Sequence, residues 1–174
     1  MTNKLKQLLH EARKGNPEFA YLAGMQLEKE GYDSFFVQSQ YRNAANNGYS
    51  IAQRWLGILG LCNLLRTDET YSAEANYNTS YEPAIGWLST AADNGDRVSL
   101  FILAKCRQLG IGMVEDEDLA EAGIASIVPF LADNDILAVN LLFDYIMSRK
   151  NLRPFELSNY CWELRGAPFY PIAG

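Results

Sequence analysis

Histidine and cysteine are scarce in this sequence, and what there is does not form a familiar metal or catalytic pattern. One histidine, His10, and three cysteines, Cys62, Cys106 and Cys161, occur among 174 residues. The cysteines are far apart and form no C-x-x-C pair, so a zinc site is not expected. We expect reduced cysteines that pack as small apolar residues. With a single histidine, a Ser-His-Asp or Cys-His catalytic site is not expected either, and no cofactor is predicted.

Positive charge and long apolar runs are lacking too. The chain has 15 Lys and Arg against 21 Asp and Glu, a net charge of -6. Nucleic acids bind clustered Lys and Arg, so they are not expected as partners. No apolar run approaches the roughly 20 residues that a membrane-spanning helix needs. The first stretch, MTNKLKQLLHEARKG, also lacks the apolar segment of a signal peptide. We therefore expect a cytoplasmic protein that binds no membrane.

The sequence does contain a recurring motif. Residues 41–57 read YRNAANNGYSIAQRWLG, and residues 88–104 read LSTAADNGDRVSLFILA. Each stretch has an alanine pair, a glycine, and small or apolar residues four, eight and nine positions after that glycine. The copies, with the residues at these offsets, are Gly15 with Phe19, Ala23 and Gly24, Gly48 with Ala52, Leu56 and Gly57, Gly95 with Ser99, Leu103 and Ala104, and a decayed copy at Asp135 with Val139, Phe143 and Asp144. Such recurrence, at irregular spacing, indicates a repeat array.

Each copy of the motif predicts a helix, a turn and a second helix. Offsets of four and eight lie on one helical face, where small residues let two helices approach closely. Gly48 and Gly95 stand where a helix ends and the chain needs a positive φ. In the third copy, the side chain of Asp116 is predicted to cap the next helix. Helices are predicted over residues 3–13, 17–29, 34–46, 50–65, 82–93, 97–109, 117–133, 136–150 and 154–164.

These features resemble the Sel1-like repeat proteins, which are relatives of the tetratricopeptide arrays. The resemblance rests on the alanine pair, the glycine, the spaced alanine, the following Leu-Gly, and the pattern G-x-G-x-x-x-D-x-x-x-A of residues 110–120. It implies an all-α fold, a right-handed α-solenoid of antiparallel helix pairs. We expect residues 1–150 to form this array, with an insertion over residues 66–83. Residues 151–174 are expected to form a capping helix and an extended tail. In this tail, Trp162, Phe169 and Tyr170 either cover the end of the array, which is the expectation we favour, or contact a partner.

The resemblance also implies a concave face, lined by the first helix of each pair. The candidate partner-binding residues on that face are Tyr21, Met25, Arg54, Ile58, Phe101 and Lys105. Three more aromatic candidates lie in or near the insertion, where they either contact a partner or pack back on the array: Tyr71, Tyr77 and Tyr81. An acidic run either complements a helix dipole or contacts a basic partner: Glu115, Asp116, Glu117 and Asp118.

Similarity to this family implies a protein-binding module without enzymatic activity. Small acidic proteins of this kind resemble bacterial immunity proteins, so one hypothesis is that the chain binds and neutralises a toxin or effector. A basic toxin would suit the negative charge. The alternative is a regulatory adaptor or an assembly scaffold. An enzyme with an unrecognised site and a self-assembling structural protein are further alternatives, and we expect a monomer or a weak homodimer.

Overall fold

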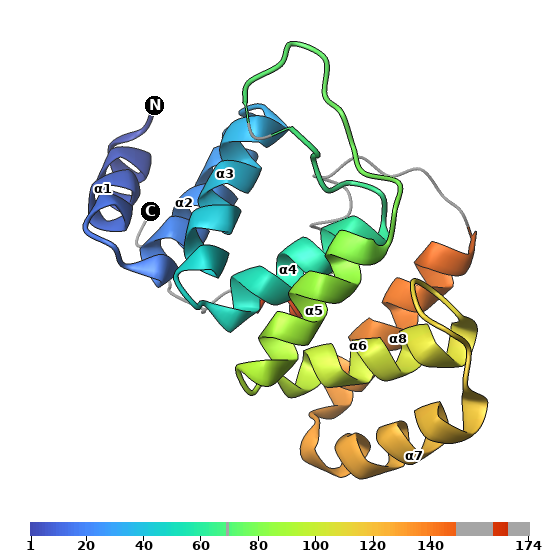
Figure 1. The fold of residues 1–174 in the computed structure, drawn as a ribbon. Coiled ribbons are helices and arrows are strands. Elements are labelled where there is room, and N and C mark those ends of the chain that lie inside the picture. The colour runs from blue at the N-terminus through green and yellow to red at the C-terminus, as the bar shows by residue number, and fades with distance from the viewer. Residues whose placement is uncertain (69, 149–161, 167–174) are drawn as a thin grey trace.

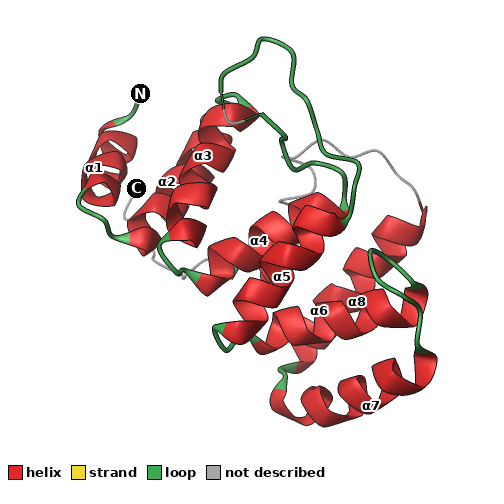
Figure 2. Cartoon of the chain, viewed as in Figure 1, coloured by secondary structure: helices red, strands yellow, loops and turns green. Residues whose placement is uncertain are grey.

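The computed structural model describes residues 1–68, 70–148 and 162–166, which form a solenoid of helices (Figures 1 and 2). Within these residues there is no strand, only one isolated bridge between Arg66 and Tyr77. The helices are α1 (Asn3–Arg13), α2 (Pro17–Lys29), α3 (Ser34–Asn46), α4 (Ser50–Leu61), α5 (Glu82–Asp93), α6 (Arg97–Leu109), α7 (Glu117–Ile127) and α8 (Asp133–Ser148), with two 3-10 turns, η1 (Val128–Phe130) and η2 (Trp162–Arg165).

Helices that follow one another pack as pairs, and the pairs stack. The pairs are α2 with α3, α4 with α5, and α6 with α7, and contacts of α3 with α4 and of α5 with α6 join them. In Figure 1, α1, α2 and α3 form one end of the array, α6, α7 and α8 form the other, and α4 and α5 lie between them. The predicted all-α solenoid of helix pairs is therefore confirmed.

The turn and cap signals of the repeat lie where the sequence predicts them. Gly48 and Gly95 have φ of 86° and 90°, a backbone conformation that favours glycine. Gly48 follows the end of α3 and Gly95 follows the end of α5, which are the first helices of two copies of the recurring motif. Asp116 Oδ1 accepts a hydrogen bond of 2.9 Å from the backbone N–H of Leu119, which satisfies one free donor at the start of α7.

Close helix approach is also confirmed at the small residues of the repeat. A Cβ atom added at Gly24 would lie 2.5 Å from the ring of Tyr41, and one added at Gly57 would lie 2.5 Å from Leu88 Cγ. Real Cβ atoms do not come so near other heavy atoms. These glycines therefore let α2 approach α3, and α4 approach α5, more closely than any larger residue would.

The predicted helix over residues 50–65 is too long, because α4 ends at Leu61. Asn63 adopts a positive φ of 57°, and the backbone N–H of Leu64 bonds back to the carbonyl of Leu59 at 2.8 Å, which closes the helix. Leu64 and Leu65 are nevertheless buried. Their apolar character reflects a loop that enters the core, and apolar periodicity alone does not separate that loop from a helix.

The predicted helix over residues 117–133 is interrupted near Pro129. The α-helix stops at Ile127 and continues as the 3-10 turn η1, because proline lacks an N–H and restricts the residue before it. The next helix, α8, starts at Asp133, earlier than the predicted residue 136. Of the helix predicted over residues 154–164, only Trp162 onward is described, and there the chain forms η2. Phe169, Tyr170 and the side chain of Trp162 lie outside the described residues.

The core is centred on α4, which packs against α3, α5 and η2. From Ala52 to Gly60 every residue of this helix is buried, and Trp55, Leu56 and Ile58 are completely covered. None of the helices in the described ranges is long and apolar enough to cross a membrane.

Candidate protein-binding surface

Arg66 anchors the long connection between α4 and α5 to the start of α3. Its side chain is fully buried (0% exposed), and its Nη1 lies 2.8 Å from Asp33 Oδ1. Its Nε donates to Asp68 Oδ1 at 2.9 Å, and its backbone N–H donates to Gln38 Oε1 at 2.9 Å. The hydrogen bonds from Arg66 hold the pKa of Asp68 below its ordinary value. A buried guanidinium needs such partners, so it holds the described part of the connection in one position.

The anchored connection carries Tyr71 to a cluster of three aromatic side chains, two of which are exposed. The ring of Tyr71 stacks on that of Phe36, with centroids 5.7 Å apart and an interplanar angle of 27°, and meets the edge of Phe35 at 5.7 Å. Tyr71 is 60% exposed and Phe36 is 44% exposed. We call Phe35, Phe36 and Tyr71 the aromatic surface. Phe35 is half-buried. Since the other two side chains remain in solvent while all three already pack on one another, they form a preorganised apolar patch.

Sequence reasoning identified Tyr71 but missed Phe35 and Phe36. A signal was present, because successive residues of a helix point about 100° apart and two adjacent phenylalanines rarely share one buried face. The Asp33 cap marks the helix start just before them: its Oδ1 accepts from the backbone N–H of Phe35 at 2.8 Å. The pair therefore stands at an exposed helix end beside the insertion.

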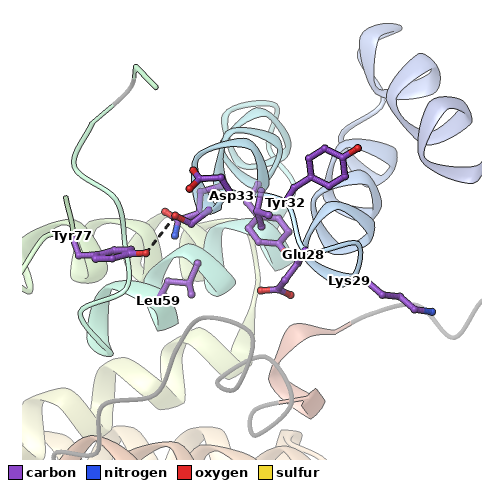
Figure 3. Close-up of a pocket in the computed structure, with 11 residues that line it drawn as sticks. Glu28, Lys29, Tyr32, Asp33, Leu59 and Tyr77 are labelled. Atoms are coloured by element: carbon purple, nitrogen blue, oxygen red, sulfur yellow. Dashed lines mark hydrogen bonds between the residues drawn. The ribbon is translucent and has the colours of Figure 1, made fainter. Parts of the chain in front are cut away.

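A cavity of about 480 Å³ lies beside the start of α3 (Figure 3). Its lining includes the carboxylates of Glu28 and Asp33 and the rings of Tyr32 and Tyr77. Tyr77 Oη and Ser34 Oγ lie 3.4 Å apart, so this second tyrosine of the insertion is bound to α3. The cavity is open, and its lining combines these acidic and aromatic groups with Lys29, next to the aromatic surface.

The third tyrosine of this group, Tyr81, packs back on the array. It is half-buried and immediately precedes α5. A Cβ atom added at Gly112, in the loop after α6, would lie 2.8 Å from Tyr81 Cβ. The structure therefore places Tyr71 in solvent, Tyr77 on a cavity wall, and Tyr81 against the third repeat.

The predicted open surface on the first helices is wrong at Tyr21 and Arg54, because the chain's own η2 turn covers both. Tyr21 Oη donates to the carbonyl oxygen of Arg165 at 2.5 Å. Arg54 Nε donates to the carbonyl oxygen of Leu164 at 3.1 Å, and its Nη1 lies 2.7 Å from Asp96 Oδ1. Burial raises the pKa of the Tyr21 phenol well above its ordinary value, so the hydroxyl keeps the proton that it donates.

The same prediction is wrong at Ile58 and Phe101, which are 0% and 2% exposed. Both point between helices into the core, so they offer no area to a partner. Met25 and Lys105 are half-buried, and Lys105 Nζ lies 5.9 Å from the centroid of the Phe101 ring. The six positions thus belong largely to the interior of the array.

The acidic run stands apart from the aromatic surface, at the start of α7. Its four side chains, those of Glu115, Asp116, Glu117 and Asp118, are exposed. Asp116 caps the helix, and the next two carboxylates lie in its first turn, where they complement the helix dipole. Among the described residues, no group of three or more His, Cys, Asp and Glu side chains is placed to hold a metal ion.

Comparison with known proteins places this fold among the helical repeats. No protein-family model matches the sequence, and no curated protein matches it. The solved structures include a similar fold, the crystal structure of a Sel1 repeat protein from Oxalobacter formigenes. The TM-score is 0.61 at 20% sequence identity, and the likeness covers 80% of this chain and 98% of that chain. The likeness extends over most of both chains, and it concerns the fold.

Proposed function

We propose that this chain, which has the predicted fold of the Sel1 repeat proteins, is a protein-interaction module without enzymatic activity. Its partner binds at the aromatic surface, formed by Phe35, Phe36 and Tyr71. The observation that carries the proposal is that Phe36 and Tyr71 are exposed, Phe35 is half-buried beneath them, and the three rings already pack on one another. Preorganised aromatic side chains lose little conformational freedom on binding, and they are enriched where protein interfaces derive most of their affinity.

The way the insertion is held supports a functional role for it. A long connection needs strong contacts to keep one position, and Arg66 supplies them from a fully buried guanidinium. Arg66 Cζ also lies 5.7 Å from the centroid of the Phe35 ring, so the anchor touches the aromatic surface directly. Long loops of compact domains are commonly functional, and a rigid anchor under an exposed patch fits a binding role.

The net negative charge of the chain and the exposed Asp33 beside the aromatic surface favour a basic partner. The net charge is -6, and the cavity next to the aromatic surface is lined by Glu28, Lys29 and Asp33, of which Glu28 is 9% exposed and paired with Arg165. The Asp33 side chain is 42% exposed. A partner that carries Lys or Arg would be steered toward this end of the array and would pair with carboxylates at the rim of the interface.

The finer proposal is that the partner is a basic toxin or effector, which this chain binds and neutralises in the cytoplasm as an immunity protein. A regulatory adaptor is the alternative. The two roles differ in how the partner is bound. An inhibitor needs one partner that it binds tightly and at equal stoichiometry, whereas an adaptor exchanges several weaker partners.

A pull-down from a lysate of the native cell tests this proposal, with the purified full chain as bait and mass spectrometry as readout. We expect one stoichiometric, basic partner that survives a high-salt wash and is toxic when expressed alone. The double variant Phe36→Ala/Tyr71→Ala should lose it. The matched control Leu119→Ala, which truncates a 51% exposed side chain on α7, should retain it. Circular dichroism and thermal melts verify that both variants are folded.

Each other outcome has a definite meaning. Several partners that are lost at high salt would replace the immunity role with an adaptor role. A partner that the double variant binds as well as the wild-type chain does would show that binding occurs on another surface. A bait that captures nothing above the background of an unrelated acidic protein would contradict the interaction module itself.

A further inference from the structure

The η2 turn contacts helices that are far apart in the array. The main contacts between helices run between close neighbours, such as α2 with α3, α3 with α4, and α6 with α8. By contrast, η2 packs on both α4 and α8, and hydrogen bonds join it to α2 and α3. In Figure 1, α2 and α3 lie toward one end of the array and α8 lies toward the other. A turn that only capped the last helix pair would not reach α2 and α3.

The side chain of Arg165 joins η2 to three helices at once. Its Nη2 lies 2.7 Å from Glu28 Oε2, near the end of α2, and donates to Tyr41 Oη of α3 at 2.9 Å. Its Cζ lies 5.3 Å from the centroid of the Trp55 ring of α4. The Arg165 and Glu28 side chains are 6% and 9% exposed. Loss of one partner of such a buried pair leaves the other charge without compensation, so this contact resists opening.

The backbone and the apolar side chain of η2 add further contacts. Arg54 Nε donates to the carbonyl oxygen of Leu164 at 3.1 Å, and Tyr21 Oη donates to the carbonyl oxygen of Arg165 at 2.5 Å. Leu164 is completely buried, in the same hydrophobic core as Leu142 of α8. In a plain solenoid each repeat contacts only its neighbours, and small rotations between neighbours set the curvature. The η2 turn adds a connection across several repeats.

The way η2 is attached lets it leave while the helices stay folded. In the described part of the chain, each hydrogen bond that joins η2 to the array uses a side chain of one partner. Two buried donors at this contact, Trp55 Nε1 and Arg165 Nε, have no acceptor, and both would gain water on release. The helices keep their own backbone hydrogen bonds. A segment attached in this way opens before the elements on which it packs.

We propose that η2 is a strap that fixes the curvature of the array, and that its release lets the two ends move apart while the helix pairs stay folded. The strap ties α2, α3 and α4 to α8 in the closed array. Because α3 also carries Phe35 and Phe36, release changes where the aromatic surface lies relative to the last helix pair. The strap is defined by contacts within the chain, and it does not rest on the function proposed for the aromatic surface.

Distances between spin labels on the two ends of the array test the strap. The labels are attached at Gln7→Cys on α1 and at Glu121→Cys on α7, two exposed positions outside η2. The full chain carries them in a background of Cys62→Ser, Cys106→Ala and Cys161→Ser. Double electron–electron resonance gives the distance distribution, and circular dichroism gives the helix content. Since both labels are on the array, release of the C-terminal segment changes the distance only if the array itself opens.

The labelled chain should give one narrow distribution of distances. Adding Arg165→Ala should lengthen the mean distance by roughly 5 Å or more, the size of the larger element shifts in conformational switches, with the helix content unchanged. The matched control is Leu88→Ala, which truncates a completely buried side chain between the neighbouring helices α4 and α5. It also removes core packing, but it should leave the mean distance unchanged because the strap is intact.

A milder variant serves if Arg165→Ala does not fold. Tyr21→Phe removes only the hydroxyl that donates to the strap, and it should add a second, longer distance to the distribution. Distributions of the folded strap variants that match that of the parent chain would overturn the proposal. The same lengthening in Leu88→Ala would overturn it, because lost stability alone would then open the array. Loss of helix content in both strap variants would also overturn it, because the helix pairs would then need η2 to fold.

Discussion

Arg54 and Asp96 form a buried ion pair that joins the second repeat to the third. Arg54 Nη1 lies 2.7 Å from Asp96 Oδ1, and the two side chains are 8% and 11% exposed. Asp96 also caps α6, since its Oδ2 accepts from the backbone N–H of Ser99 at 3.1 Å. One arginine therefore connects α4, the start of α6 and the carbonyl of Leu164. The residue that the sequence placed on an open binding face stabilises the stacking of the array.

Arg54→Ala should lower the free energy of unfolding by about 3 kcal/mol, because it leaves a buried carboxylate without its cation. Urea denaturation followed by circular dichroism measures this change. Arg13→Ala is the control, since Arg13 is exposed in the last turn of α1, and it should change the same quantity by about 0.5 kcal/mol or less. A loss of less than about 1 kcal/mol for Arg54→Ala, the value typical of exposed pairs, would contradict the structural role.

Two glycine-to-alanine substitutions should shift stability in opposite directions. A Cβ atom at Gly57 would lie 2.5 Å from Leu88 Cγ and 3.2 Å from the carbonyl oxygen of Ala84, so Gly57→Ala should cost about 1–3 kcal/mol. Gly86 is also inside a helix, but a Cβ atom there meets nothing within 4 Å. Gly86→Ala should therefore stabilise the chain by up to about 1 kcal/mol through helix propensity. Urea midpoints that move in the same direction would refute the close packing of α4 on α5.

The attachment of the insertion should weaken in acid. The pKa of Asp68 is held below its ordinary value by the hydrogen bonds from Arg66. A carboxyl group with a lowered pKa stabilises the folded state above its unfolded-state pKa, and this stabilisation is lost as the pH falls through the folded-state value. We therefore expect an anchored insertion at pH 7 and a loosened one below about pH 4.

Amide hydrogen exchange of the insertion measures this effect. The backbone N–H of Asn78 donates to the carbonyl of Leu65 at 2.7 Å, so its protection factor reports the anchoring. That protection should fall from pH 6 to pH 3, after correction for the intrinsic rates. Asp68→Asn should lower it already at pH 7. Protection that is equal at both pH values, together with an unaffected Asp68→Asn chain, would refute the role of this carboxylate.

The thiol of Cys106 should be unreactive in the folded chain. It is completely buried, and burial raises its pKa to about 12. The thiolate is the reactive form, so a Cys62→Ser/Cys161→Ser chain should react with Ellman's reagent at pH 8 only after denaturation. Reaction at the rate of a free thiol in the folded chain, verified by a thermal melt, would show that the core around α6 opens readily.

The sequence predicted most of the fold because the repeat signals are local. Gly48 and Gly95 mark turns, and Gly24 and Gly57 mark close helix contacts, each readable within one repeat. The end of α4 was mispredicted because Leu64 is buried from a loop, and burial in a loop has no periodicity that distinguishes it from burial in a helix.

The candidate sites were less predictable because their contacts are long-range. Arg165 meets Tyr41 from 124 positions away, and no local pattern indicates that η2 fills the inner side of the array. Arg66 likewise reaches Asp33 across 33 positions. Tyr71 was predictable because tyrosine in a long insertion is typical of interfaces, but the phenylalanines under it belong to another helix.

Photo-crosslinking at position 71 tests the central claim, that a protein partner binds at the aromatic surface, most directly. Benzoylphenylalanine replaces Tyr71 in one chain and Leu119 in a second, two side chains that are 60% and 51% exposed on different parts of the array. After irradiation in the native cell, we predict one crosslinked partner of a single mass at position 71 and none at position 119. The absence of a crosslink at position 71, or the same products at both positions, would contradict the account.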